Sequence, residues 1–232
     1  MRILAGTSGY AYKEWKGPFY PDDLPNSGML SYYAEHFATV EINNTFYRMP
    51  RESVLEGWAE QVSADFRFVL KVSRRITHFQ RLDNVDEPLS YLLNTATVLG
   101  KRLGPLLFQL PPNMKKEIVR LKGLLAALPR NRRAAFEFRH DSWYDDDVYA
   151  ALAEHNQALC IADTDDGEPH VVRTADWGYL RLRRADYAPS DLHRWSRTVH
   201  EQTWETAYVF FKHEDDGAGP RLAKAFLAEA AE

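Results

Sequence analysis

Short apolar runs recur along the chain, and segments with helical periodicity separate most of them. Runs of this length indicate buried strands, and the longer amphipathic segments between them indicate helices. Eight such runs are present: Arg2–Ala5, Thr39–Ile42, Phe66–Val72, Pro105–Leu110, Ala134–Phe138, Ala158–Ala162, Gly178–Leu182 and Ala207–Phe211. The helical pattern appears at seven places: Gly28–Phe37, Glu52–Val62, Leu89–Lys101, Glu117–Leu128, Asp145–His155, Asp191–Thr203 and Pro220–Ala230.

This alternation predicts an α/β fold in which eight strands close into a TIM (β/α)₈ barrel. Spread over 232 residues, the eight runs repeat every 29 residues, which is close to the βα unit of such barrels. The segment Asp163–Trp177 contains DTDDGEP, a turn-rich sequence, so we expect an irregular connection between strands six and seven. We expect residues 1–232 to form one domain.

The composition excludes some classes of protein but does not identify a binding partner. The chain is 45% hydrophobic, and 29 Lys and Arg against 33 Asp and Glu give a net charge of −4. These values exclude a collagen-like or broadly disordered chain and argue against a globally basic nucleic-acid coat, but they leave room for a local basic site. The single Cys160 excludes an intrachain disulfide and a multi-cysteine zinc site, and we expect it to be a small buried residue.

No apolar stretch of the kind found in signal peptides or membrane spans is present. We therefore expect a soluble, unprocessed, cytoplasmic protein without a membrane partner. The pattern leaves the oligomeric state open.

Five polar residues interrupt the apolar runs: Glu41, Lys71, Gln109, Glu137 and Arg181. Burying a charge is costly unless it is paired and hydrogen-bonded, so these side chains should face one another inside the barrel mouth. One hypothesis is general acid/base chemistry, with one carboxyl kept protonated by burial and the other ionised beside Lys71 or Arg181. The alternative is a structural layer of ion pairs that catalyses nothing.

The working residues of a (β/α)₈ barrel lie at the carboxyl ends of its strands. We expect catalytic groups in Glu41, Glu137 and His78, and an anion site in Lys71, Arg139 and Arg181. The full set of expected ligand contacts is Thr7, Ser8, Tyr10, Asn43, Lys71, Gln109, Arg139, His140, Asp163 and Arg181. No dinucleotide or phosphate-loop motif and no close metal-ligand spacing occurs, so we expect neither a cofactor nor a metal.

Five sequence blocks carry a resemblance to a known family: GTSGYAYKEWKGPFYP, VEINNTFYRMP, FRFVLKVSRRITHFQRL, LGPLLFQLPP and AFEFRHDSW. On these blocks the chain resembles the domain-of-unknown-function 72 family, also called YecE-like. The resemblance implies a TIM barrel and no established activity. Two late segments differ from the family pattern: Arg183 and Arg184 stand near its His-Gly positions, and Lys212-His213 replaces its Asn-Asn pair. If these positions bind a ligand in the family, the differences imply that this chain binds a variant of that ligand or binds it in a different way.

Two classes of function follow from these residues. The first is an enzyme-like barrel that binds a phosphate-bearing ligand, such as a nucleotide, a sugar phosphate or nucleic acid, with hydrolytic acid/base chemistry. The second is a non-catalytic binding or protein-interaction module in which the charged layer stabilises the barrel.

Overall fold

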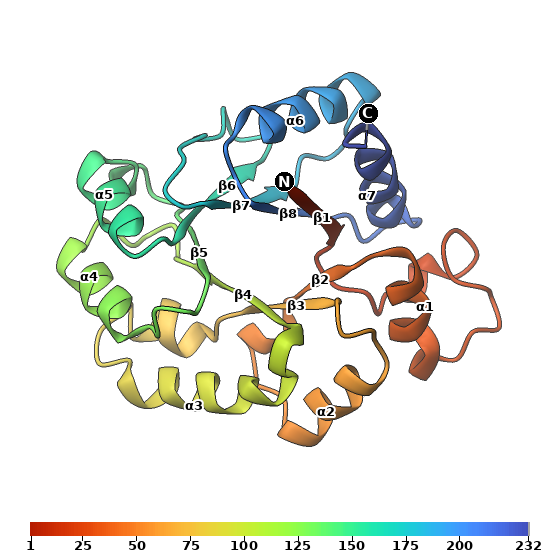
Figure 1. The fold of residues 1–232 in the computed structure, drawn as a ribbon, viewed down its shortest axis with the longest axis horizontal. Coiled ribbons are helices and arrows are strands. Elements are labelled where there is room, and N and C mark those ends of the chain that lie inside the picture. The colour runs from red at the N-terminus through yellow and green to blue at the C-terminus, as the bar shows by residue number, and fades with distance from the viewer. Residues whose placement is uncertain (232) are drawn as a thin grey trace.

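The computed structural model describes residues 1–231 and confirms the predicted (β/α)₈ architecture (Figure 1). Eight parallel strands pair in the order β1-β8-β7-β6-β5-β4-β3-β2. Their bounds are Arg2–Thr7 (β1), Thr39–Ile42 (β2), Arg67–Lys71 (β3), Leu103–Gln109 (β4), Ala134–Glu137 (β5), Ala158–Asp163 (β6), Trp177–Leu182 (β7) and Thr206–Phe211 (β8). Between β1 and β2 the pairing is a single bridge from Ser8 to Glu41, so the ring is nearly closed.

Helices surround the ring of strands (Figure 1). Their bounds are Met29–His36 (α1), Glu52–Glu60 (α2), Asp86–Ala96 (α3), Ile118–Ala127 (α4), Asp146–Glu154 (α5), Pro189–Glu201 (α6) and Ala218–Glu229 (α7). The third helix begins earlier than predicted and gives way to a 3₁₀ turn, Thr97–Arg102, in which Gly100 has a φ of 53°. Because an α-helix cannot continue through that conformation, the predicted end at Lys101 was wrong.

The connection from β6 to β7 contains no helix, as the turn-rich sequence predicted. It holds one isolated antiparallel bridge, Thr164 with Gly167. None of the helices among residues 1–231 is long and apolar enough to cross a membrane.

Alternation along the strands divides the apolar side chains between two cores. Leu4, Val69, Leu107 and Cys160 belong to a small cluster that fills the barrel, while a larger cluster packs between the strands and the helices. Successive residues of a strand point to opposite faces of the sheet, so every second side chain enters the barrel. Cys160 is buried there, as expected.

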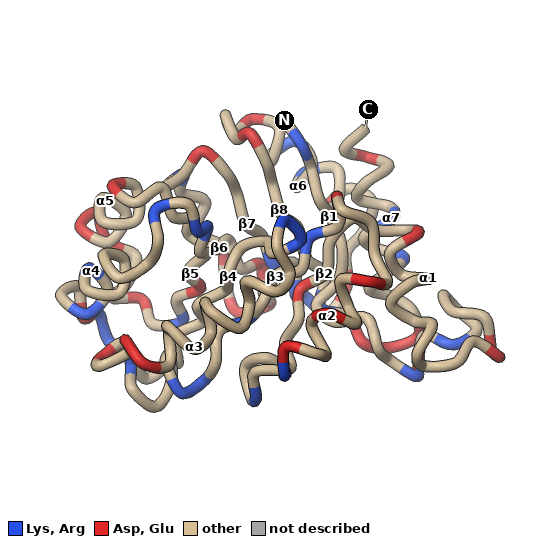
Figure 2. Tube along the Cα trace, turned by 60° about the horizontal axis from the view of Figure 1, so that its bottom comes forward, with Lys and Arg blue, Asp and Glu red and all other residues tan. Residues whose placement is uncertain are grey.

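Acidic and basic residues are mixed over the outer helices and loops, and charges of both signs also lie among the strands (Figure 2). Charges on the outside reach water, whereas charges on the strands need partners. The charged side chains of the strands that enter the barrel must therefore be paired with one another.

Candidate functional site

Arg181 forms the centre of a buried ion-pair network in the barrel mouth. From β7 it donates through Nη2 to Glu41 Oε1 of β2 at 2.8 Å and through Nη1 to Glu137 Oε2 of β5. The Arg181 side chain is only 2% exposed, and both carboxylates are buried. The prediction that the lone charges of the strands meet inside the barrel is confirmed for these three, whereas Lys71 forms an ion pair with neither carboxylate among the described residues. The guanidinium of Arg181 donates to both carboxylates and is almost fully buried. A ligand that enters the mouth would therefore contact other side chains before Arg181.

Two hydroxyls complete the shell of Glu41. Ser8 Oγ donates to Oε1 at 2.7 Å, and the Tyr179 hydroxyl donates to Oε2 at 2.6 Å. The Ser8 hydroxyl therefore donates to a carboxylate of the mouth, and its contact with a ligand oxygen stays a prediction. Sequence reasoning missed Tyr179, although a signal was present. Tyr179 and Arg181 are alternate residues of one strand and therefore share a face, which Arg183 extends just past the end of that strand.

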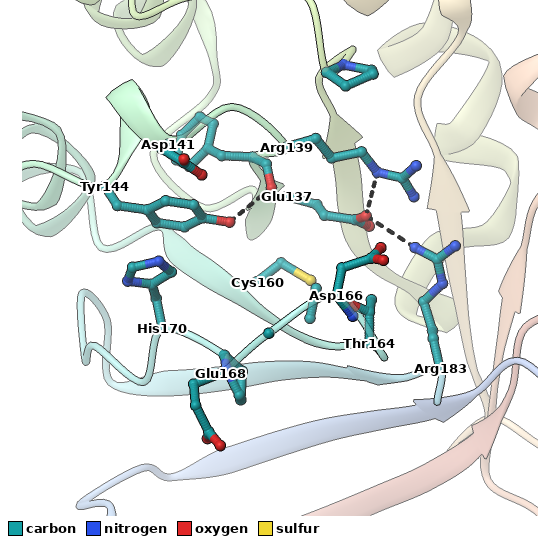
Figure 3. Close-up of a pocket in the computed structure, with 15 residues that line it drawn as sticks. Glu137, Arg139, Asp141, Tyr144, Cys160, Thr164, Asp166, Glu168, His170 and Arg183 are labelled. Atoms are coloured by element: carbon teal, nitrogen blue, oxygen red, sulfur yellow. Dashed lines mark hydrogen bonds and ion pairs between the residues drawn. The ribbon is translucent and has the colours of Figure 1, made fainter. Parts of the chain in front are cut away.

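Glu137 is held by three arginines. Besides Arg181, Arg139 Nε lies 3.0 Å and Arg183 Nη1 lies 3.2 Å from its Oε1 (Figure 3). Burial alone would raise the pKa of Glu137, but the charges of the three arginines outweigh it and lower the pKa to about 2. Glu137 is accordingly an ionised acceptor at neutral pH.

Glu41 is ionised for the same reason. Burial acts to raise its pKa, but the charge of Arg181 and the hydrogen bonds from Tyr179 and Ser8 lower it below the usual value. The expectation that burial keeps one of the two carboxyls protonated was wrong. An opposite charge and several donors at each carboxylate favour the charged form more than burial disfavours it.

Lys71 extends the network toward solvent. Its Nζ donates to Gln109 Oε1 at 2.7 Å, and Arg139 Nη2 approaches the same oxygen at 3.4 Å. The ammonium also lies 4.5 Å from the centroid of the Phe46 ring. Burial, followed by the charge of Arg181, lowers the pKa of Lys71 to about 8. Lys71 thus lies among cations, and no carboxylate of residues 1–231 is within ion-pair distance of its ammonium.

The network of buried and half-buried charges, taken without the acidic residues of the surrounding loops, carries a surplus of positive charge. Its two carboxylates, Glu41 and Glu137, face four cations, so the cluster has a net charge of +2 in a chain whose overall charge is −4. The four cations are Lys71, Arg139, Arg181 and Arg183.

A cavity of about 340 Å³ opens beside Glu137, between the ends of β5 and β6 and the loop at 164–170 (Figure 3). Arg139 and Arg183 approach Glu137 along one wall. On the other side, the rings of Tyr144 and His170 stack with centroids 3.6 Å apart. The remaining polar lining includes Asp141, Thr164, Asp166 and Glu168. None of these loop residues was predicted from the sequence.

Thr7 and Asp163 face the helical layer instead of the mouth, contrary to prediction. Thr7 Oγ1 lies 3.0 Å from the Tyr33 hydroxyl of α1. Asp163 accepts from Trp195 Nε1 of α6 at 2.9 Å and pairs with Arg184 at 3.2 Å. The reason is strand alternation: Cys160 of β6 points into the barrel, so Asp163, three residues on, points out.

The two predicted histidines differ in position. His140 Nδ1 accepts from the Ser142 backbone N–H at 3.2 Å and caps the short turn Asp141–Trp143, so it serves its own loop. His78 lies on a π-helical turn, Arg75–Phe79, with its ring 4.9 Å from that of Phe46. Burial, followed by the charge of Lys71, lowers the pKa of His78, so His78 belongs to the cationic side of the mouth.

Tyr10 and Asn43 line a different cavity from Arg139 and Arg183. It has a volume of about 180 Å³ and opens between the ends of β1 and β2, with Tyr12 and Trp58 in its wall. Over residues 1–231, no group of three or more His, Cys, Asp or Glu side chains is placed to hold a metal ion.

Comparison with known proteins gives relatives that match part of the chain. UPF0759 protein YecE of Escherichia coli (strain K12) is 34% identical over 131 residues, which is 56% of this chain and 46% of that protein. UPF0759 protein YunF of Bacillus subtilis (strain 168) is 28% identical over 159 residues, 63% of this chain and 54% of that protein. The matched segments thus span about half the length of these relatives.

Solved structures match the whole fold. A DUF72 family protein of Thermotoga maritima MSB8 superimposes with a TM-score of 0.89 at 25% identity, covering 100% of both chains. A second, from Enterococcus faecalis V583, gives a TM-score of 0.81 at 19% identity and covers 99% of this chain and 96% of that one. The family profile described as "Protein of unknown function DUF72" matches residues 4–232. The chain therefore belongs to the DUF72 family.

Proposed function

We propose that the barrel mouth binds a phosphate-bearing ligand through Lys71, Arg139 and Arg183. The observation that carries this proposal is the net charge of +2 of the ion-pair network itself, counted without the acidic loop residues of the cavity. Arg139 and Arg183, which are 32% and 20% exposed, present that charge to the cavity. Two of the four positive charges are neutralised by Glu41 and Glu137, and the surplus favours an anion.

Unused hydrogen-bond donors support the same ligand class. An ammonium has three donors and a guanidinium five. Lys71 uses one of its donors on Gln109, and Arg183 uses Nη1 on Glu137, while Arg183 Nε is buried without a partner among the described residues. Such donors match phosphate oxygens, which accept several charge-assisted hydrogen bonds.

The cavity beside Glu137 suits the rest of such a ligand. Its volume of about 340 Å³ lies within the range of small-molecule sites. Asp141 and Asp166 offer carboxylate oxygens to hydroxyl groups, and Tyr144 with His170 offers a stacked aromatic wall. A phosphate group could bind Arg139 and Arg183 on one wall, while an attached hydroxylated or ring-shaped group contacts the acidic and aromatic residues on the other.

Binding is better supported than hydrolysis. A carboxyl that protonates a leaving group must carry its proton near neutral pH, and the pKa values of Glu41 and Glu137 are both lowered. Each carboxylate is also engaged by several donors, which leaves Glu137 as an organiser of Arg139 and Arg183.

Isothermal titration with inorganic phosphate and ribose 5-phosphate tests the proposal. We expect Arg139→Gln to weaken binding by about tenfold or more, because it removes a charge-assisted contact. Arg197→Gln is the matched control, since Arg197 pairs with Glu201 on the outer face of α6. Equal and negligible heats for the native protein and both variants would refute the proposal.

A structural layer is the second candidate, and it has its own observation. Arg181 and Tyr179 both donate to Glu41 in the buried part of the mouth, as a stabilising network requires, although Arg181 Nε has no partner among the described residues. Glu137→Gln separates the two candidates. A purely structural layer predicts a loss of thermal stability alone, whereas the binding proposal predicts altered phosphate affinity as well, because Arg139 and Arg183 lose their shared anchor.

A further inference from the structure

The rim of the mouth beyond Lys71 carries exposed aromatic rings beside cations. Tyr47, in the loop after β2, is 66% exposed, and Phe79, in the turn after β3, is 69% exposed. The guanidinium carbon of Arg74 lies 5.5 Å from the Tyr47 ring centroid and 5.3 Å from that of Phe79. Single exposed rings are common, but two of them on either side of one cation form a contiguous patch, and such patches mark binding sites.

The two loops that hold these rings are strongly basic. Residues 43–51 and 71–85 contain six Lys and Arg and a single acidic residue, Asp83, which gives a net charge of +5. The whole chain carries −4, so the remaining residues sum to −9. Of the six cations, only Arg75 has an acidic partner within ion-pair distance among residues 1–231, namely Glu87. The positive charge of this rim is thus largely free for a polyanion.

Contacts run without a break from these rings into the mouth. Phe46 packs edge-on against Tyr47, with centroids 5.1 Å apart, and the ammonium of Lys71 lies over the Phe46 ring. Lys71 then shares the side-chain oxygen of Gln109 with Arg139. Because β2 and β3 are paired neighbours, the loops that follow them lie side by side. A chain molecule could follow this line from the exposed rings to the proposed phosphate site.

We propose that the ligand of the mouth is a single-stranded nucleic acid whose bases stack on Tyr47 and Phe79 while its phosphates follow Arg74, Lys71 and Arg139. This inference rests on the proposed function and assigns its ligand class. Aromatic rings interleaved with cations match the two repeating parts of a single strand, the flat base and the phosphate. In a duplex the base faces are covered by their neighbours, so exposed rings favour a single strand.

An acidic polypeptide would also be attracted by the charge, but it has no flat face for each ring. The exposed rings of Tyr47 and Phe79 therefore favour a single-stranded nucleic acid over an acidic polypeptide. Removing a ring should weaken a stacked ligand while leaving the electrostatic attraction unchanged.

Fluorescence anisotropy of labelled oligo(dT) of about 12 nucleotides tests the inference on the full chain. We expect Tyr47→Ala and Phe79→Ala each to weaken binding by about fivefold or more. Tyr91→Ala is the matched control: Tyr91 is a 58% exposed tyrosine on α3, and its removal should change nothing. Arg74→Gln should reduce the slope of log affinity against log salt by about one unit.

Several results would overturn the inference. An oligo(dT) affinity that is the same in the native protein, Tyr47→Ala and Phe79→Ala would show that charge attraction alone accounts for binding. Equal affinity for the matching duplex, or complete displacement by poly-glutamate at the same charge concentration, would exclude base stacking. Phosphate binding that depends on Arg139 without measurable oligo(dT) binding would refute this inference and leave the proposed function intact. If neither ligand binds, both fail.

Discussion

Replacing Arg181 with alanine is the sharpest test of how the mouth is built. The substitution removes the one side chain that joins Glu41 to Glu137 and leaves two buried carboxylates behind. Glu41 keeps its hydrogen bonds from Ser8 and Tyr179, and Glu137 keeps the arginines at its outer side. The fold should survive, at a large cost in stability.

The size of that cost can be estimated in two ways. Breaking a buried ion pair by removing one partner costs about 3 to 5 kcal/mol, because an uncompensated charge remains. As an upper bound, lowering the pKa of Glu137 from 4.5 to about 2 corresponds to about 3 kcal/mol of preferential stabilisation of the ionised form, and Arg181 shares this effect with Arg139 and Arg183. For a chain of this length such a loss lowers the Tm by roughly 6 to 20 °C.

Thermal and urea unfolding, followed by circular dichroism at pH values of about 5 and 7, measure this loss. Without Arg181 the pKa of Glu41 should rise above its unfolded value, so the penalty is present above the raised pKa and is relieved as pH falls. The stability deficit should therefore be smaller at the lower pH. Glu41→Gln in the Arg181→Ala background should recover part of the loss. A deficit below about 1 kcal/mol, or one independent of pH, would refute the assignment of Arg181 as the anchor of the network.

Three further outcomes follow from the same contacts. Tyr179→Phe should cost about 1.5 to 3 kcal/mol in urea unfolding, since it removes a buried donor to the Glu41 carboxylate; an unchanged midpoint would contradict the bond. Phosphate affinity should fall by about tenfold toward a pH of about 9, because Lys71, with its pKa lowered to about 8, loses its charge; a flat calorimetric profile to that pH would remove Lys71 from the site. Asp163→Asn should lower stability by about 1 to 2 kcal/mol and leave phosphate affinity unchanged, because Asp163 bonds to Trp195 outside the mouth; a change in affinity would place it in the site.

The barrel and its buried charges were predictable from the sequence because both depend on local patterns. Apolar runs at a regular spacing fix the strands, and a lone charge such as Glu41 or Arg181 within a run must find a partner inside the barrel. The same reasoning failed for Thr7 and Asp163 because it used position along the strand and neglected which face each residue occupies. Counting alternate residues from buried Cys160 would have corrected Asp163.

The cavity lining could not be predicted in this way. His170 and Asp166 lie in the irregular connection between β6 and β7, which has no periodicity from which to read a direction. Their approach to Tyr144 depends on how that loop folds back over β5 and β6. The protonation of the carboxyls was likewise beyond the sequence, because it depends on the number of donors that converge in space.

Strand β7 explains how one network can serve both stability and binding. Tyr179 and Arg181 of β7 point to the same face, and Arg183 lies just past the end of the strand with its backbone N–H still bonded to Asp163 of β6. Alternate residues of extended chain are separated by about 6.6 Å, so the three reach successively higher levels of the barrel. Tyr179 and Arg181 are buried and donate to the carboxylates, whereas the Arg183 side chain is 20% exposed and lines the cavity. A ligand therefore meets Arg183 before it meets Arg181. Deep in the barrel, Arg181 neutralises the charge of the carboxylates. The surplus positive charge lies nearer the opening, on side chains such as Arg183 that solvent can reach.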